Sequence, residues 1–232
     1  MARTGELTPV GHGSFEIAAL SAGGVIKGTD AVIAGEIDNC YALVRPPGHH
    51  AEADMCRGSC IFGNIAIAVH HCLAVHGMER IAVVDGDVHH GNGTETAFYN
   101  DAGAYSVAFE QLVVPALRKF KPQIIFVASG FDASAFDPLG RMMMTSAGYA
   151  QLTNTLLAAA DELCGGKIVM AHEGGYSPEY VPLCGLAVLE AITGIPSGVE
   201  DPYLAFAAGM GRQDLQPEQQ AVLDVVRSIH GL

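Results

Sequence analysis

The chain has 232 residues, of which 50% are hydrophobic and only 16% are charged. This composition is typical of a compact globular protein and excludes an intrinsically disordered one. The length allows one sizeable hydrophobic core, so we expect a single domain over residues 1–232. The formal net charge of −13 argues against a nucleic-acid partner.

The N-terminus and the cysteines indicate the cellular setting. Residues 1–6 do not resemble a signal peptide, and no apolar stretch reaches the length of about 18 residues that predicts a membrane span. The six cysteines lack the paired spacing of a structural zinc site. We therefore expect core thiols, a reducing cytoplasm and no membrane partner. The sequence leaves the oligomeric state open, a homo-oligomer included.

The first third of the chain predicts a loop, a helix, a strand and a second helix. Residues 1–13 form the loop, and Ser14 is expected to cap a helix that ends near Ala34 before Gly35. The apolar stripe of that helix comprises Phe15, Ala18, Ala22, Val25 and Ile26. A strand follows over residues 41–44 and a helix over residues 65–76. We expect the histidines of this second helix to be solvated, since no carboxylate stands at ligand spacing: His70, His71 and His76.

A tandem pair of histidines follows the first predicted strand, in the segment Arg45-Pro-Pro-Gly-His-His50. The two prolines keep the backbone extended, and Gly48 permits a sharp turn. His49 and His50 are thus presented together at a strand end. This placement favours a catalytic role for both.

The stretch from Val83 to Thr94 concentrates residues that can bind a metal. An apolar run over residues 81–84 predicts a buried parallel strand, and Asp85, Asp87 and His89 follow it. Alternate residues of an extended chain share a side, so these three side chains are expected to point the same way. Sites in open α/β sheets lie at the carboxyl ends of strands.

Two more buried strands are predicted to end in polar groups. The strand over residues 124–128 leads to Asp132, and the strand over residues 167–171 leads to Glu173-Gly-Gly-Tyr176. A helix is expected over residues 94–99, and residues 101–103 should end it. Further helices are expected over residues 107–120, 147–163, 180–193, 202–208 and 217–229. Thr145 or Ser146 should cap the helix over residues 147–163. Alternating strands and helices predict an α/β parallel sheet covered on both faces.

Asp87, His89 and Asp132 together could form an open zinc site with two carboxylates and one imidazole. Three protein ligands leave a position for water and substrate, which is typical of a catalytic site. Such an ion polarises a bound carbonyl and lowers the pKa of water toward ~7.

The remaining polar residues suit hydrolysis of an amide. His49 or His50 could move the proton, while Asp85 and Asn92 are near enough in sequence to orient the two imidazoles. The Tyr176 hydroxyl could donate to the developing oxyanion, a contact worth roughly 3 kcal/mol.

Four motifs resemble the zinc-dependent histone deacetylase family, above all the bacterial histone deacetylase-like amidohydrolases and acetylpolyamine amidohydrolases. They are Arg45-Pro-Pro-Gly-His-His50, Asp85-Gly-Asp-Val-His-His-Gly-Asn-Gly-Thr94, Ser129-Gly-Phe-Asp-Ala133 with Asp137-Pro-Leu139, and Glu173-Gly-Gly-Tyr176. The resemblance implies the arginase/deacetylase three-layer sandwich with a central, mainly parallel sheet. It also implies removal of acetyl or other short acyl groups from a small acylated amine, such as an acetylpolyamine, or from an acetyl-lysine peptide.

The resemblance assigns roles at matching positions. Asp87, His89 and Asp132 would hold one Zn²⁺, and a structural K⁺ would lie near Asp85, Asp87 and His89, bound largely through backbone carbonyls. His50 would be the general base and acid, with His49 its electrostatic partner. Tyr176 would be the oxyanion donor.

The chain also departs from the family pattern. Ser59 stands where an aromatic wall of the acyl channel is usual, and Gly63 and Gly86 replace larger residues. These changes predict a roomier substrate channel beside Gly174 and Gly175. An N-terminal segment and a Gly-rich segment with a strand, expected between Tyr99 and Val107, are missing, so we expect an exposed sheet edge.

Two alternatives stay open at this point. The chain could be a catalytically idle module that binds acyl-lysine or polyamines, as Ser59 and the missing segments suggest. An arginase-type ureohydrolase is disfavoured because it needs a second metal and further aspartates, where this chain has Gly91 and Ser134.

Overall fold

The computed structural model describes the chain except for residues 1–2, 6, 99–103, 107–110, 141 and 211–216. Its main sheet has five parallel strands in the order β2-β7-β6-β4-β5. The strands are β2 (Cys40–Ala42), β4 (Ile81–Asp85), β5 (Ala104–Ser106), β6 (Ile124–Ser129) and β7 (Ile168–His172). The central strands β4, β6 and β7 are apolar and almost wholly buried, as strands covered on both faces must be.

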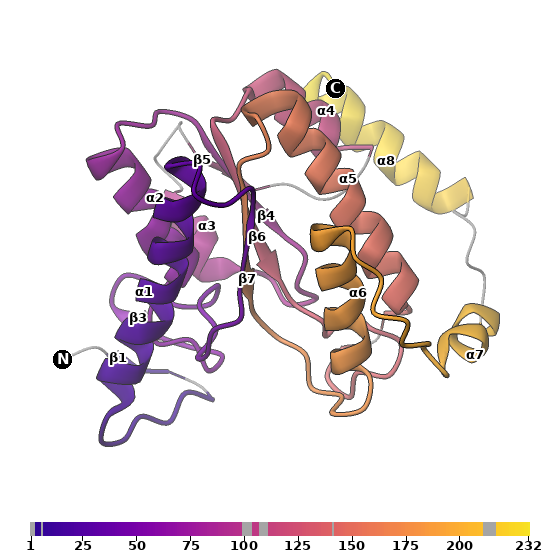
Figure 1. Cartoon of the computed structure of the whole chain (residues 1–232), viewed down its shortest axis with the longest axis horizontal. Coiled ribbons are helices and arrows are strands. Elements are labelled where there is room, and N and C mark those ends of the chain that lie inside the picture. The colour runs from indigo at the N-terminus through magenta and orange to yellow at the C-terminus, as the bar shows by residue number, and fades with distance from the viewer. Residues whose placement is uncertain (1–2, 6, 99–103, 107–110, 141, 211–216) are drawn as a thin grey trace.

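Helices cover both faces of this sheet (Figure 1). One face carries α1 (Ser14–Ile33), α2 (Asn64–Val75) and α3 (Asn92–Phe98), and the other carries α4 (Val113–Phe120), α5 (Ser146–Cys164) and α6 (Val181–Thr193). Strand β4 shows the division, because Ile81 and Val83 pack in the core under α1 and α2 while Ala82 and Val84 face the other core. The predicted α/β sandwich is confirmed.

Two further helices follow, α7 (Leu204–Gly209) and α8 (Pro217–His230). No helix in the described ranges combines the length and the apolar character needed to cross a membrane.

Most predicted helix ends agree with the structure within a few residues. Thr145 caps α5 by accepting from the Gly148 N–H at 3.1 Å, and Gly165 ends that helix in the left-handed conformation. The cap predicted for α1 is wrong, because Gly13 takes the N-cap position and Ser14 is already helical. The prediction that Phe15 belongs to the buried stripe is also wrong: Phe15 is 66% exposed, and its ring packs edge-on against Phe62.

Two parts of the chain differ from the prediction. The N-terminal loop contains β1 (Arg3–Thr4), which pairs in parallel with β3 (Met55–Cys56) as a small second sheet. Helix α4 begins at Val113 rather than at residue 107, and residues 101–103 and 107–110 lie outside the described residues.

The sheet edge beside β4 is partly covered. Strand β5 pairs with residues 81–83 of β4, although the sequence predicted only a connection there. Within the described chain, Val84 and Asp85 pair with β6 alone. β5 therefore covers the expected exposed edge of β4 over residues 81–83, and β5 itself is the last strand on that side of the described sheet.

Candidate active site

The stretch after β4 is built from turns. The strand ends at Asp85, whose carboxylate accepts from the Asp87 N–H at 3.1 Å, and Asp87 in turn accepts from the His89 N–H at 2.8 Å. The expectation that these side chains alternate along an extended strand is therefore wrong. Short side-chain to backbone bonds, favoured by aspartate, aim each residue separately.

Three side chains from two strand ends meet in what we call the strand-end cluster: Asp87, His89 and Asp132. His89 Nδ1 lies 2.9 Å from Asp132 Oδ2 and 3.2 Å from Asp87 Oδ1, and one ligand atom of each residue lies within 4.8 Å of the others. Both carboxylates are buried. Burial and the neighbouring charge of Asp87 raise the pKa of Asp132 to about 6. Two buried carboxylates this close favour a positive partner, so the donor set fits a divalent ion such as zinc.

The backbone holds the strand-end cluster in place. The Gly174 N–H donates to Asp87 Oδ2 at 2.9 Å, and the Val88 N–H donates to Asp132 Oδ1 at 3.0 Å. A Cβ at Gly174 would lie 2.2 Å from Asp132 Oδ2, and one at Gly130 would lie 2.2 Å from Asp87 Oδ2. Glycine is therefore required at both positions by the close approach of the carboxylates.

The tandem histidines lie beside this cluster and differ in their environment. His49 is buried, and its Nδ1 lies 3.1 Å from Asp85 Oδ2, while its Nε2 lies 3.8 Å from Asp87 Oδ2. Burial alone would lower the pKa of His49, but the bond to Asp85 and the nearby carboxylates outweigh it and raise that pKa to about 9.

His50 has the opposite tendency. Its ring lies 4.0 Å from the His49 ring, and burial together with the charge of His49 lowers its pKa, although its hydrogen bond to Asn92 Oδ1 opposes this. At neutral pH the pair therefore holds one charged and one neutral imidazole.

Glu52, which the sequence analysis did not single out, fixes the orientation of His50 through Asn92. Asn92 Oδ1 lies 2.7 Å from His50 Nδ1, and Asn92 Nδ2 donates to Glu52 Oε1 at 2.6 Å. A carboxylate only accepts, so Glu52 forces the amide nitrogen toward itself and the amide oxygen toward His50. His50 then carries its proton on Nδ1 and leaves Nε2 free as a base. The position of Glu52, two residues after His50, is the signal that could have found it.

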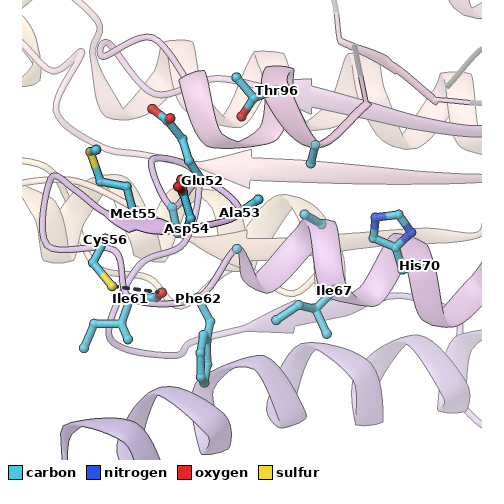
Figure 2. Close-up of a pocket in the computed structure, with 14 residues that line it drawn as sticks. Glu52, Ala53, Asp54, Met55, Cys56, Ile61, Phe62, Ile67, His70 and Thr96 are labelled. Atoms are coloured by element: carbon cyan, nitrogen blue, oxygen red, sulfur yellow. Dashed lines mark hydrogen bonds between the residues drawn. The ribbon is translucent and has the colours of Figure 1, made fainter. Parts of the chain in front are cut away.

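Glu52 also lines a cavity of about 530 Å³ (Figure 2). Figure 2 shows Asp54, Met55 and His70 among the side chains that line it. Gly63 lines the cavity as well, so the missing bulk at this position leaves room here. This cavity is not lined by the strand-end cluster.

Glu173 belongs to the predicted Glu173-Gly-Gly-Tyr176 motif, but no role of its own was predicted for it from the sequence. Its Oε2 accepts from the N–H groups of Gly48 and His49 at 2.7 and 3.1 Å, which fixes the turn that presents the histidine pair. Oε1 is buried and has no hydrogen-bond partner among the described residues. Burial raises the pKa of Glu173 to about 7, even though the charge of His49 opposes this.

Tyr176 stands at the rim of the site. Its ring lies 6.4 Å from the His89 ring, and the residue is 40% exposed. The Tyr176 N–H donates to Asp137 Oδ2 at 2.6 Å, which fixes the loop that carries the tyrosine. Burial and the charges of Asp132 and Asp87 raise the pKa of Tyr176 to about 12, so the hydroxyl keeps its proton at neutral pH.

The residues predicted to line the substrate channel lie at different distances from the strand-end cluster. Gly174 lies against the strand-end cluster, whereas Gly175, which has φ 130°, packs against Phe131 and Val181. Ser59 is exposed and lies farther out, where its hydroxyl donates to the Leu7 carbonyl at 3.3 Å. Gly58, next to it, lies against the His50 ring.

Comparison with known proteins identifies the family. A model of the histone deacetylase domain matches residues 2–107 and 100–192. The chain belongs to the histone deacetylase family. It is 44% identical to a histone deacetylase-like amidohydrolase of Pseudomonas aeruginosa, over 87% of this chain and 64% of the relative. It is 32% identical to a probable deacetylase of Archaeoglobus fulgidus, over 84% of this chain and 66% of that protein.

A solved structure supports the same fold. The crystal structure of the HDA15 HD domain superposes with a TM-score of 0.74 at 29% identity and covers 81% of this chain and 67% of the other. The predicted histone deacetylase resemblance and the arginase/deacetylase fold are thus confirmed.

The comparisons also show that the chain is shorter than its relatives. It spans 64% and 66% of the length of the two relatives above. The alignment with the Pseudomonas protein extends over 245 positions, more than the 232 residues of this chain, so that relative has residues without a counterpart here. The two stretches matched by the family model overlap at residues 100–107, the region where the sequence analysis expected an internal gap.

Proposed function

We propose that this chain is a zinc-dependent amidohydrolase that removes acetyl or other short acyl groups from N-acylated amines. Acetyl-lysine peptides and acetylpolyamines are the two substrate classes. The observation that carries the proposal is the placement of the His49–His50 pair directly beside the strand-end cluster. Membership of the histone deacetylase family supports the same chemistry.

Asp87, His89 and Asp132 would hold the zinc ion. When bound, zinc polarises an amide carbonyl and lowers the pKa of water toward ~7. The N–H groups of Gly174 and Val88 hold the two carboxylates before any ligand arrives, so the site is preorganised. A structural K⁺ beside Asp85, Asp87 and His89 belongs to this proposal through the family resemblance.

His50 is proposed as the group that moves the proton. It is the neutral imidazole of the pair, and the Glu52–Asn92 contact leaves its Nε2 able to accept a proton from water and return it to the leaving amine. His49 stays protonated between Asp85 and Asp87 and stabilises negative charge. Tyr176 keeps its hydroxyl proton and would donate to the developing oxyanion.

An arginase-type reaction fits less well. A second metal would need another acidic ligand beside the strand-end cluster, but a Cβ at Gly91 would lie 2.1 Å from Asp85 Oδ2. The other position where an arginase-type enzyme needs an aspartate holds Ser134, which is fully buried. The geometry therefore leaves no room for a further carboxylate at residue 91.

The test is zinc content together with turnover of an acetyl-lysine coumarin amide and of N-acetylputrescine. We expect one zinc ion at the strand-end cluster and hydrolysis of at least one of the two substrates. Zinc binding without hydrolysis of either, at every pH from about 6 to 9, would instead favour the idle binding module.

A further inference from the structure

Helices α1 and α2 share a second group of imidazole and carboxylate side chains, which we call the helix-pair cluster: Asp30, His71 and His76. His71 Nε2 and His76 Nε2 lie 2.7 and 2.8 Å from the same atom, Asp30 Oδ1. Both histidines are partly exposed, as predicted, but the prediction that no carboxylate lies at ligand spacing from them is wrong. The carboxylate comes from α1, 41 residues before His71, which no local spacing shows.

We infer that the helix-pair cluster binds a divalent transition-metal ion of the zinc type. One ligand atom from each residue lies within 4.8 Å of the other two. Two imidazoles and one carboxylate form a donor set that zinc accepts, with open positions for water.

The distances between the two Nε2 atoms and Asp30 Oδ1 need only a small adjustment for all three atoms to bind one zinc ion. Bonds of 2.0–2.1 Å in tetrahedral geometry separate neighbouring ligand atoms by about 3.3 Å, so each nitrogen has to move back from Asp30 Oδ1 by roughly 0.5 Å. The three side chains are 22%, 24% and 38% exposed for His71, His76 and Asp30. They can therefore rotate without disturbing the core.

The electrostatic setting favours a cation. Asp30 lies in the last turn of α1, and His76 follows the last residue of α2, so two helix C-termini direct negative partial charge toward the cluster. Neither last turn contains a lysine or arginine. Hydrogen bonds, first that with His76 and then that with His71, keep the pKa of Asp30 below its usual value although partial burial opposes this, so Asp30 is ionised at neutral pH.

The same two helices hold the segment that carries the histidine pair. Ser21 Oγ of α1 and Asn64 Nδ2 of α2 both donate to the Pro46 carbonyl, at 2.8 and 3.0 Å. Asp30 lies nine residues after Ser21, about 13 Å farther along the helix. An ion at the helix-pair cluster would therefore join α1 to α2 at their carboxyl ends and stabilise the scaffold of the Pro46–His50 segment from a distance.

The experiment measures bound zinc per chain by equilibrium dialysis at neutral pH, followed by thermal unfolding with and without zinc. Four chains are compared: the parent, Asp132→Ala, His76→Ala and the double variant. We expect about two equivalents of zinc in the parent, about one in each single variant and none in the double variant. Zinc should raise the Tm of Asp132→Ala and leave that of the double variant unchanged.

His70→Ala is the matched control, since His70 neighbours His71 on α2 but lines the cavity of Figure 2. It should bind as much zinc as the parent, whereas His71→Ala should behave like His76→Ala. Circular dichroism of the metal-free variants checks that they fold.

The inference fails if His76→Ala and His71→Ala bind as much zinc as the parent, or if zinc leaves the Tm of Asp132→Ala unchanged. It does not depend on the proposed function. A parent chain that binds one equivalent, lost in His76→Ala and kept in Asp132→Ala, would support the helix-pair site while removing zinc from the proposed function.

Discussion

The strand-end cluster and the helix-pair cluster contain the same kinds of side chain in opposite surroundings. In the first, the carboxylates are buried and fixed by backbone N–H groups, and charged and neutral imidazoles stand beside them. In the second, all three side chains are partly exposed, and the two histidines contact only Asp30 in the hydrogen bonds described. Burial turns the first group into a site with perturbed pKa values, whereas solvent leaves the second adaptable.

The comparison teaches that ligand type alone does not decide what a cluster can do. Catalysis requires residues around the ligands that set protonation and orientation, and here Glu52, Asn92 and Asp85 act on the histidine pair. The helix-pair cluster has no such surrounding groups in the hydrogen bonds of the described structure. It is therefore suited to hold an ion and unsuited to move protons.

The largest expected effect comes from removing a carboxylate of the strand-end cluster. Asp132→Ala should abolish zinc binding there and bring turnover below detection, because the open site would keep only two protein ligands. Zinc analysis of the strand-end site and the coumarin assay measure this. Retained activity in this variant would show that Asp132 is not a ligand.

Gly174→Ala should come next. Its Cβ would meet Asp132 and Asp87, so we expect a loss of about 1–3 kcal/mol in the free energy of unfolding, together with weaker zinc binding. Gly23→Ala in α1 is the control, since its Cβ would meet nothing within 4 Å. That change should stabilise the helix by about 0.5–1 kcal/mol. If urea unfolding showed effects of the same sign for both variants, the close approach of the carboxylates would not be the reason for glycine at position 174.

Tyr176→Phe should reduce kcat about 10²- to 10³-fold while leaving zinc content unchanged. The hydroxyl would act only on the developing oxyanion, so zinc binding does not need it. Steady-state kinetics and zinc analysis on the same sample separate the two effects. Full activity in Tyr176→Phe would rule out the oxyanion role.

Glu52→Ala should lower kcat about 10- to 100-fold, since Asn92 could then turn its amide nitrogen toward His50. Glu52→Gln should restore much of the rate, because its amide oxygen can still accept from Asn92. Glu95→Ala is the control: Glu95 pairs with His90 at the surface and should leave kcat unchanged. Equal loss in Glu52→Ala and Glu52→Gln would mean that the charge of Glu52, rather than its acceptor, matters.

The smallest effect is expected for His76→Ala in the presence of a chelator. Partly exposed ion pairs contribute about 0–1 kcal/mol, so metal-free stability should hardly change. Urea unfolding measures this. A loss well above that range would show that the His76–Asp30 contact is itself a main stabiliser of the helix pair.

The local sequence pattern was enough to predict much of the fold. The apolar runs of β4, β6 and β7 predict buried strands because neither face of such a strand meets water, and the Thr145 cap and Gly165 stop bound α5 through short-range chemistry. Strands β1 and β5 escaped prediction, as did β3, the partner of β1. They have two or three residues each, and their pairing partners rather than their composition make them strands.

For the site, the sequence by itself determined which residues assemble at strand ends, because parallel strands bring their carboxyl ends to one edge. In this way the sequence predicted one site from Asp87, His89, Asp132, His49 and Tyr176, and the resemblance to the family rests on their motifs. Only the tertiary structure decided how these groups are oriented and charged. The Asn92 amide is turned by Glu52, 40 residues away, and the two helix histidines face Asp30 from another helix. Such contacts depend on packing between distant segments, which local spacing does not encode.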